Sequence, residues 1–342
     1  MTRLPLTAAL LALAPLATAQ AQQAGEPGTP YANMNHLAPI GVRTDRYLPV
    51  PDAAKGPPID PAKGYRTEYL GGGAYMVTDN GYNSMFLVYE TGVVVVDAPP
   101  SYAALLLAAI RAVTDKPVTH MIYSHSHADH IGGTLALGKV PVIIAQEETK
   151  RLLAEAHDPN RPLPTLTFKD RYMLKVGSRT IQLSYPGYGH SPGNILIHVP
   201  GAKVLMVIDT VFPGWMPWRR LALAQDITGL FRIMHEIEGM DFDKLVGGHV
   251  ERWGTKADVT QQLEFMNDLK AAAATALKTT KPGEELDSAD KANPWAIYDN
   301  YIDRVVVQCM NTLEPKWRDR LGGYDAFIWD QCYAMEQSLR ID

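Results

Sequence analysis

Three histidines and one aspartate occupy six positions of Tyr123–Gly133, which reads YSHSHADHIGG, in a chain with only ten histidines among 342 residues. His125 and His127 are two positions apart after an apolar run, and in extended backbone such side chains point to the same side. Asp129 and His130 follow where the chain turns, so they project in another direction. Because imidazole and carboxylate groups bind zinc and similar ions, the stretch predicts a metal site with room for two ions.

These four side chains do not complete a two-metal site, so other parts of the chain must supply further ligands. The best candidates are His and Asp residues that follow predicted strands and have Gly or Pro close by for a tight turn. They are Asp97 after Val93–Val96, His190 in Gly-His-Ser-Pro-Gly, Asp209 in VLMVIDT and His249 in LVGGH. The remaining histidines, His36, His120, His157, His198 and His235, fit no such pattern and are interpreted as structural or surface residues.

In chain order, these residues resemble the five motifs of the metallo-β-lactamase-fold hydrolase superfamily, over roughly residues 66–279. The residues that carry the resemblance are Asp97, His125-x-His127-x-Asp129-His130, His190, Asp209 and His249. The resemblance implies that His125, His127 and His190 bind one metal ion. It implies that Asp129, His130 and His249 bind a second ion, with Asp209 bridging the two and the Asp97 carboxylate orienting a ligand or a loop. Two Zn²⁺ ions are the implied cofactors, and iron or manganese occurs in similar sites.

Such a site implies hydrolysis. Two divalent ions about 3.5–4 Å apart share a water, lower its pKa and polarise the substrate oxygen that gains charge. Asp129 beside that water would orient it or return its proton to the leaving group, which makes Asp129 the expected catalytic residue. The implied nucleophile is therefore metal-bound hydroxide.

The aspartate at position 209 narrows the class of hydrolase that the chain resembles. Antibiotic-hydrolysing members usually have Cys or Ser at this motif, whereas Asp is similar to glyoxalase-type thioesterases, N-acyl-homoserine lactonases, phosphotriesterases and tRNA-processing nucleases. An acidic, exported chain fits a nuclease poorly. Lactonases often have Tyr three residues after the bridging Asp. Phe212 stands here without that hydroxyl, and Tyr82 or Tyr188 could replace it.

A loop rich in aromatic residues follows Asp209 and reads Phe-Pro-Gly-Trp-Met-Pro-Trp over residues 212–218. Phe212, Trp215 and Trp218 suggest an apolar wall for a substrate, although packing of the loop against the protein explains them nearly as well. Tyr82, at the tip of the first hairpin, is a weaker candidate for the facing wall.

The favoured function is hydrolysis of a small-molecule lactone or other carboxylic ester with an apolar portion. A β-lactamase is the nearest alternative, because export suits that role, followed by a phosphotriesterase or thioesterase. A mononuclear-iron sulfur oxygenase shares the HxHxDH pattern but is seldom exported. A non-catalytic binding protein is disfavoured because every ligand position is filled.

The first 21 residues have the charged start, short apolar run and small-residue exit of a signal peptide, and the run is short for a membrane span. We therefore expect a secreted or periplasmic protein that is not stably inserted in a membrane. Removing this segment takes away Arg3 and changes the formal net charge from −5 to −6. With no basic runs, binding to nucleic acid is not expected.

Cys309 and Cys332 are the two cysteines of the chain, and in an oxidising compartment they predict one disulfide. Buried free thiols are the alternative, since cysteine is among the most often buried residues.

Strand signals at the start of each half, followed by strand–helix alternation, predict an α/β (α+β) fold: an αββα sandwich of two mixed sheets flanked by helices. We expect a signal peptide at 1–21, an extended arm at 22–64, the catalytic domain at 65–280 and a helical extension at 281–342. Strands are predicted at 66–78, 83–89, 92–97, 118–123, 141–145, 171–175, 180–185, 194–199, 203–208 and 244–248. Helices are predicted at 103–113, 146–156, 227–238 and 256–279. The tryptophans Trp295, Trp317 and Trp329 are expected to pack the extension onto the body or onto a second subunit, which leaves a homodimer open.

Overall fold

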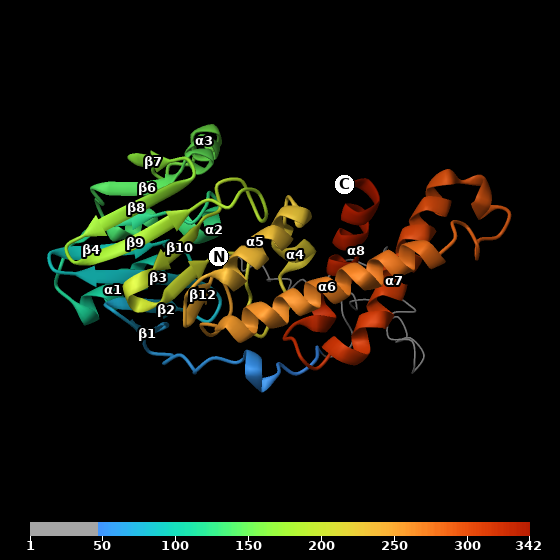
Figure 1. The fold of residues 1–342 in the computed structure, drawn as a ribbon, viewed down its shortest axis with the longest axis horizontal. Helices are drawn as coiled ribbons and strands as arrows, with labels where there is room; N and C mark the ends of the chain where they lie inside the picture. The colour runs from blue at the N-terminus through green and yellow to red at the C-terminus, as the bar shows by residue number, and fades with distance from the viewer. Residues whose placement is uncertain (1–46) are drawn as a thin grey trace, which may run out of the picture. The chain divides into compact units, whose positions relative to one another are not determined.

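The computed structural model describes residues 47–342 and contains two β-sheets packed face to face, beside which α6 (Lys256–Thr279), α7 (Pro294–Trp317) and α8 (Tyr324–Ile341) extend to one side (Figure 1). The predicted signal peptide and the first part of the predicted arm lie outside the described residues. The first sheet has the order β1-β2-β3-β4-β5-β6-β7 and the second β12-β11-β10-β9-β8. The expected sandwich of two mixed sheets flanked by helices is therefore confirmed.

The strands mostly match the predicted ranges. Those of the first sheet are β1 (Arg66–Gly71), β2 (Ala74–Thr78), β3 (Asn83–Tyr89), β4 (Gly92–Val96), β5 (Val118–Ile122), β6 (Val142–Gln146) and β7 (Leu166–Phe168). Those of the second are β8 (Arg171–Val176), β9 (Arg179–Ser184), β10 (Leu196–Val199), β11 (Val204–Val207) and β12 (Lys244–Gly247).

The valine run of β4 shows why the two sheets pack as they do. Val94 and Val96 point into the core between the sheets, whereas Val93 and Val95 point into a second core beneath α1 (Ala103–Val113). Because successive side chains of a strand alternate between its faces, a run of four valines is covered on both sides. The prediction of a doubly buried strand is confirmed.

The prediction of one strand over residues 66–78 is wrong, because the chain reverses direction within it. Gly71, Gly72 and Gly73 all have positive φ, at 112°, 54° and 85°, and they join β1 to β2 as a hairpin. Glycine adopts such angles without the steric cost of a Cβ, which explains a turn where alternation alone suggested continuity. The strand β7 was not predicted either, because its three residues are too few to show a period.

The helices flank the sheets and extend beyond them (Figure 1). They are α2 (Ala128–Ile131), α3 (Glu147–Ala156), α4 (Arg219–Leu223), α5 (Ile227–Gly239), α6 (Lys256–Thr279), α7 (Pro294–Trp317) and α8 (Tyr324–Ile341). Short 3₁₀ turns lie at Asp52–Ala54, Thr134–Leu137, Pro200–Ala202 and Asp290–Ala292. The long helix α6 begins where predicted, with a capping box in which Thr255 and Asp258 satisfy each other's backbone N–H groups.

A helical extension follows α6, as predicted, and consists mainly of α7 and α8 packed on α6. Trp317 is fully buried there against Phe265 of α6, which explains part of the attachment. Trp329 stacks on Tyr333 within α8, whereas Trp295 is 78% exposed and does not pack on the body.

Among residues 47–342, no helix combines the length and apolar composition needed to cross a bilayer.

Cys309 of α7 and Cys332 of α8 form a disulfide with an S–S distance of 2.09 Å, and both residues are fully buried. The predicted disulfide is confirmed, and it ties the two helices of the extension together.

We expect the double substitution Cys309→Ser/Cys332→Ser to lower the free energy of unfolding by about 3 kcal/mol, because the bond limits the unfolded chain. Urea denaturation of the two proteins measures this. In dithiothreitol the wild-type protein should lose a similar amount and the variant nothing; equal loss in both would contradict the assignment.

Candidate metal centre

The predicted ligands come together because they follow neighbouring parallel strands. β4 pairs with β5 in the first sheet, β11 pairs with β12 in the second, and both pairs are parallel. The carboxyl ends of parallel strands lie at the same edge of a sheet. Asp97 follows β4, the His125 stretch follows β5, Asp209 follows β11 and His249 follows β12. His190 joins them from the loop between β9 and β10.

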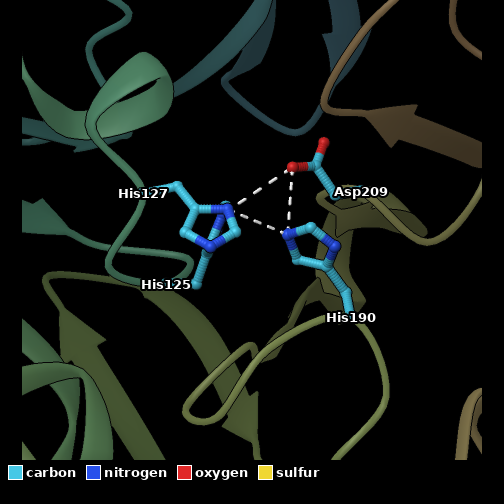
Figure 2. A group of neighbouring side chains, drawn as sticks. All are labelled: His125, His127, His190 and Asp209. Carbon is cyan, nitrogen blue, oxygen red and sulfur yellow. Dashed lines mark hydrogen bonds and ion pairs between the residues drawn. The ribbon is translucent and has the colours of Figure 1, made fainter. Parts of the chain in front are cut away.

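Figure 2 shows the first group of side chains, His125, His127, His190 and Asp209, whose ligand atoms all lie within 4.8 Å of one another. The Nε2 atoms of His125 and His190 are 3.7 Å and 3.3 Å from Oδ2 of Asp209. Nε2 of His190 is also 3.1 Å from Nδ1 of His127. Three ring nitrogens and one carboxylate oxygen therefore converge on one point, as in a metal site.

The second group is Asp129, His130 and His249, and Asp209 joins it to the first. Oδ2 of Asp209 is 3.1 Å from Nε2 of His130, and Oδ1 is 3.1 Å from Nε2 of His249. Oδ2 of Asp129 lies 3.6 Å from Nε2 of His130 and 4.0 Å from Nε2 of His249. The structure thus brings all seven predicted ligands together, in the two groups that the resemblance implies.

Several polar atoms of this cluster are buried and have no hydrogen-bond partner outside the cluster. They are Nε2 of His125, both ring nitrogens of His130 and Oδ1 of Asp209. Buried polar atoms almost always have partners, so such a group of exceptions calls for an explanation. Bound cations would give partners to three of these atoms: Nε2 of His125, Nε2 of His130 and Oδ1 of Asp209. The residues present therefore fit metal ions.

Hydrogen bonds behind the ligands fix which ring nitrogen faces the centre. Ser124 Oγ donates to Oδ2 of Asp97 at 2.6 Å, so the Nδ1–H of His125 donates to Ser124 Oγ at 2.8 Å. The Nδ1–H of His190 donates to the carbonyl of Ala222 at 2.6 Å, because a carbonyl can only accept. In each ring Nε2 keeps its lone pair for a metal ion.

His249 is oriented in the same way. Its Nδ1–H donates to the carbonyl of Gly81 at 3.2 Å, and its Nε2 faces Asp209. Asp97 lies behind His125: its Oδ1 also accepts the backbone N–H of Ser124 at 2.9 Å. Its carboxylate therefore holds the residue next to His125 at two points.

Burial and the neighbouring charges set the protonation of the cluster. Burial lowers the pKa of His127 to about 4 and holds that of His125 well below its ordinary value, with help from adjacent imidazoles. Burial would raise the pKa of Asp209, but His130 and His190 hold it well below normal. Burial would likewise lower the pKa of His130, but Asp209 reverses this and raises it to about 9. The cluster thus holds a buried carboxylate beside neutral imidazoles at His125 and His127, whereas His130 carries a proton that a bound cation would replace.

The backbone is tightly turned where the carboxylates enter the site. Asp97 and Asp209 have φ of 56° and 54°, in the left-handed region that Asp tolerates better than most residues. Gly248 lies beside Asp209, and a Cβ there would come within 2.7 Å of Oδ1 of Asp209 and 3.0 Å of His130. Only glycine allows β12 to approach the carboxylate this closely.

The aromatic residues proposed for the substrate pocket lie in different places. The ring of Tyr82 is 4.6 Å from that of His249 and 5.6 Å from that of His130. Burial, and then the charge of Asp129, raises the pKa of its hydroxyl. Phe212 is 4% exposed and stacks on His249. Trp218 and Tyr188 are 48% and 49% exposed.

Trp215 packs away from the predicted ligands. Its Nε1–H donates to the carbonyl of Ala54, and its ring covers Gly322 of the extension. Trp215 therefore packs the loop against the arm and the extension and does not form part of a substrate wall. Leu223, which is 43% exposed and adjoins Ala222, is an apolar residue that the sequence analysis missed.

Sequence reasoning also missed Ser124, Ala222 and Gly81, which orient ligands. The two that use a backbone carbonyl leave no signal in side-chain type. Ser124, by contrast, directly precedes His125, and its hydroxyl could have been predicted to bond a neighbouring ligand ring.

Residues 77–272 match the family model described as "Metallo-beta-lactamase superfamily". This match covers more than half of the chain, and the chain belongs to that superfamily. A metallo-beta-lactamase from Pontibacter korlensis has the same fold, with a TM-score of 0.51 at 20% identity, covering 58% of this chain and 97% of that one.

Two curated relatives show how wide the similarity is. The chain is 28% identical over 240 residues to "2,4-dinitroanisole O-demethylase subunit alpha" of Nocardioides sp. (strain JS1661), covering 65% of this chain and 67% of that one. It is 31% identical over 127 residues to a "Metallo-beta-lactamase type 2" of Elizabethkingia meningoseptica, covering 36% of this chain and half of that one. The superfamily of this chain is thus established, and the two relatives carry the names of different enzymes.

We expect Gly248→Ala to lower the amount of metal bound to the purified protein, because the added methyl group displaces Asp209. Gly239→Ala is the matched control, since a Cβ at Gly239 meets nothing within 4 Å. Elemental analysis after gel filtration measures the difference. Equal metal content in the two variants would show that the close approach at Gly248 does not matter.

Proposed function

We propose that this protein is an exported hydrolase with two Zn²⁺ ions that opens a lactone or cleaves another carboxylic ester with an apolar portion. The observation that carries the proposal is the position of Asp209 between the two ligand groups. One of its oxygens lies near His190 and His130, and the other lies near His249. A carboxylate shared in this way supports a two-metal hydrolytic site.

Two bound Zn²⁺ ions would supply an activated water and polarise the ester carbonyl. The chain's own residues would then manage the proton and the substrate. Asp129 is suited to hold and return a proton, because its side chain is 45% exposed whereas that of Asp209 is only 6% exposed. It lies at the accessible side of the cluster, where a leaving group would depart.

Tyr82 supports ester chemistry in a second way. Burial, and then the charge of Asp129, raises the pKa of its hydroxyl, and its ring adjoins His130 and His249. It therefore offers a hydrogen-bond donor at the site, which Phe212 cannot do. A donor near the reacting carbonyl stabilises the negative charge that develops on its oxygen.

An apolar part of the substrate is supported by exposed side chains on the two segments beside His190. Tyr188 precedes this ligand, Trp218 precedes the turn whose Ala222 carbonyl holds it, and Leu223 is the last residue of that turn. Backbone bonds from Gln225 to the carbonyls of Gly189 and His190 join these segments. Large exposed apolar side chains near a site favour an apolar ligand.

A second candidate is hydrolysis of an activated aryl ether, favoured by the 240-residue similarity to the O-demethylase subunit. Hydrolysis of a β-lactam amide ranks below both, because Asp209 stands where the antibiotic-hydrolysing members usually have Cys or Ser. Export is supported by the composition of residues 1–21.

A substrate panel tests the proposal. N-acyl-homoserine lactones, aryl esters, a thioester, paraoxon, nitrocefin and 2,4-dinitroanisole are compared, with metal content measured on the same preparation. We expect lactone or ester turnover with about two zinc equivalents, lost on chelation and restored by Zn²⁺. Turnover of nitrocefin alone would favour the β-lactamase, turnover of dinitroanisole alone the aryl ether hydrolase, and one tightly bound iron the oxygenase.

We expect Tyr82→Phe to lower kcat on the best substrate about 100-fold, because it removes one donor to the developing charge. Metal content should not change, since the phenol is not a ligand. Tyr188→Phe is the matched control and should keep kcat within about twofold. A normal kcat in Tyr82→Phe would remove this residue from the mechanism.

A further inference from the structure

The short helix α4 has an unusual backbone. Arg220, Leu221, Ala222 and Leu223 have φ of 54°, 53°, 60° and 55°, so four successive non-glycine residues form a left-handed turn. For L-amino acids this conformation brings Cβ close to the following carbonyl oxygen, and such residues normally occur singly. The turn therefore needs outside support to persist.

The turn touches the metal centre through one atom. The carbonyl of Ala222 accepts the Nδ1–H of His190 at 2.6 Å, and Ala222 N donates to the carbonyl of Trp218 at 2.7 Å. In a right-handed turn the Ala222 carbonyl would point elsewhere. The left-handed conformation thus decides where His190 is held.

The support comes from α8, mainly through Gln331, which is fully buried. Its Oε1 accepts the backbone N–H of Leu221 at 2.6 Å. Its Nε2 donates to the carbonyls of Pro217 and Trp218, at 2.5 Å and 3.3 Å. One side chain therefore bonds the segment that enters the turn and the turn itself.

A second contact joins the same two elements. Asp330, the neighbour of Gln331, pairs with Arg219 at 2.9 Å. α8 begins at Tyr324, beyond the end of the superfamily match at residue 272. The support for α4 thus comes from a part of the chain that the superfamily model does not include.

We propose that Gln331 is a positioning residue for the metal ligand His190, so that the helical extension completes the metal centre. The path runs from the Gln331 amide to the backbone of Leu221, then to the Ala222 carbonyl and the Nδ1–H of His190. This inference rests on the proposed metal binding. Partners that orient metal-bound histidines commonly change metal affinity 10- to 100-fold.

Gln331→Met tests the proposal, because it removes the hydrogen bonds and keeps a similar side-chain volume. We expect zinc affinity, measured by competition with a chelating dye, to fall about 10- to 100-fold at one of two sites. Gln337→Met is the matched control, on the same helix, with its side chain bonded to Glu336 and Arg340 of α8. It should leave both affinities unchanged.

Two further variants separate positioning from general loss of stability. In a His190→Ala background, Gln331→Met should cause no additional loss of affinity, because its effect passes through His190. Ala222→Gly should restore part of the affinity lost in Gln331→Met, because glycine adopts the left-handed region at no steric cost. An additive loss in the first case, or no recovery in the second, would overturn the positioning role.

The Co²⁺-loaded protein gives a spectroscopic readout, since loss of one imidazole ligand changes the visible absorption of cobalt. We expect a changed spectrum for Gln331→Met and an unchanged one for Gln337→Met. If Gln331→Met does not fold, Arg219→Met replaces it. That variant removes the ion pair between α4 and Asp330 of α8 and should weaken zinc binding in the same direction.

Metal binding by the wild-type protein and by Gln331→Met distinguishes failure of this inference from failure of the proposed function. A wild-type protein that binds no metal would remove both. A wild-type protein with two bound ions, together with normal affinity and spectrum in Gln331→Met, would overturn the role of Gln331 and leave the hydrolase standing.

Discussion

A buried carboxylate at the end of β11 is the constraint on which the rest of the site depends. Asp209 is 5% exposed, and a charge removed from water in this way is costly unless positive groups or a metal ion surround it. Histidines from the β5 end, the β9–β10 loop and the β12 end meet around its two oxygens. Gly248 leaves room for this approach, and the left-handed φ of Asp209 turns its side chain inward.

Once these ligands are buried, the direction of each ring also has to be fixed, since an imidazole binds a metal through only one nitrogen. The chain does this with partners of different kinds. Asp97 and Ser124 hold His125, the Ala222 carbonyl holds His190, and the Gly81 carbonyl holds His249. The groups that orient the ligand rings therefore come from three places: the end of β5, the left-handed turn of α4 and the turn between β2 and β3. Structure far from the ligands in sequence thereby becomes part of the site.

The residues that surround the predicted ligands come from the β2–β3 turn, the loop after Asp209 and the helical extension. The turn between β2 and β3 that orients His249 also places the ring of Tyr82 beside His249 and His130, while position 212 has a phenylalanine that stacks on His249. The extension holds the loop after Asp209 at several points, including Trp215 against Gly322 and Arg219 with Asp330. The exposed residues between Phe212 and Leu223 are Trp218, Arg220 and Leu223, and the carbonyl of Ala222 beside them holds the ligand His190.

The sequence by itself determined the sandwich fold, the ligand types and their order, because strand periodicity and metal-ligand spacing are local patterns. The HxHxDH stretch and the residues at the strand ends were readable one segment at a time. The sequence could not show the Gly71–Gly73 reversal, the packing of Trp215 or the left-handed turn at α4. Each of these features depends on contacts with residues that are distant in the sequence or on another strand. Only the tertiary structure decided that Gln331, more than a hundred residues after His190, supports that ligand. The reason is physical: a strained backbone persists only where distant groups hold it, and its own sequence does not record them.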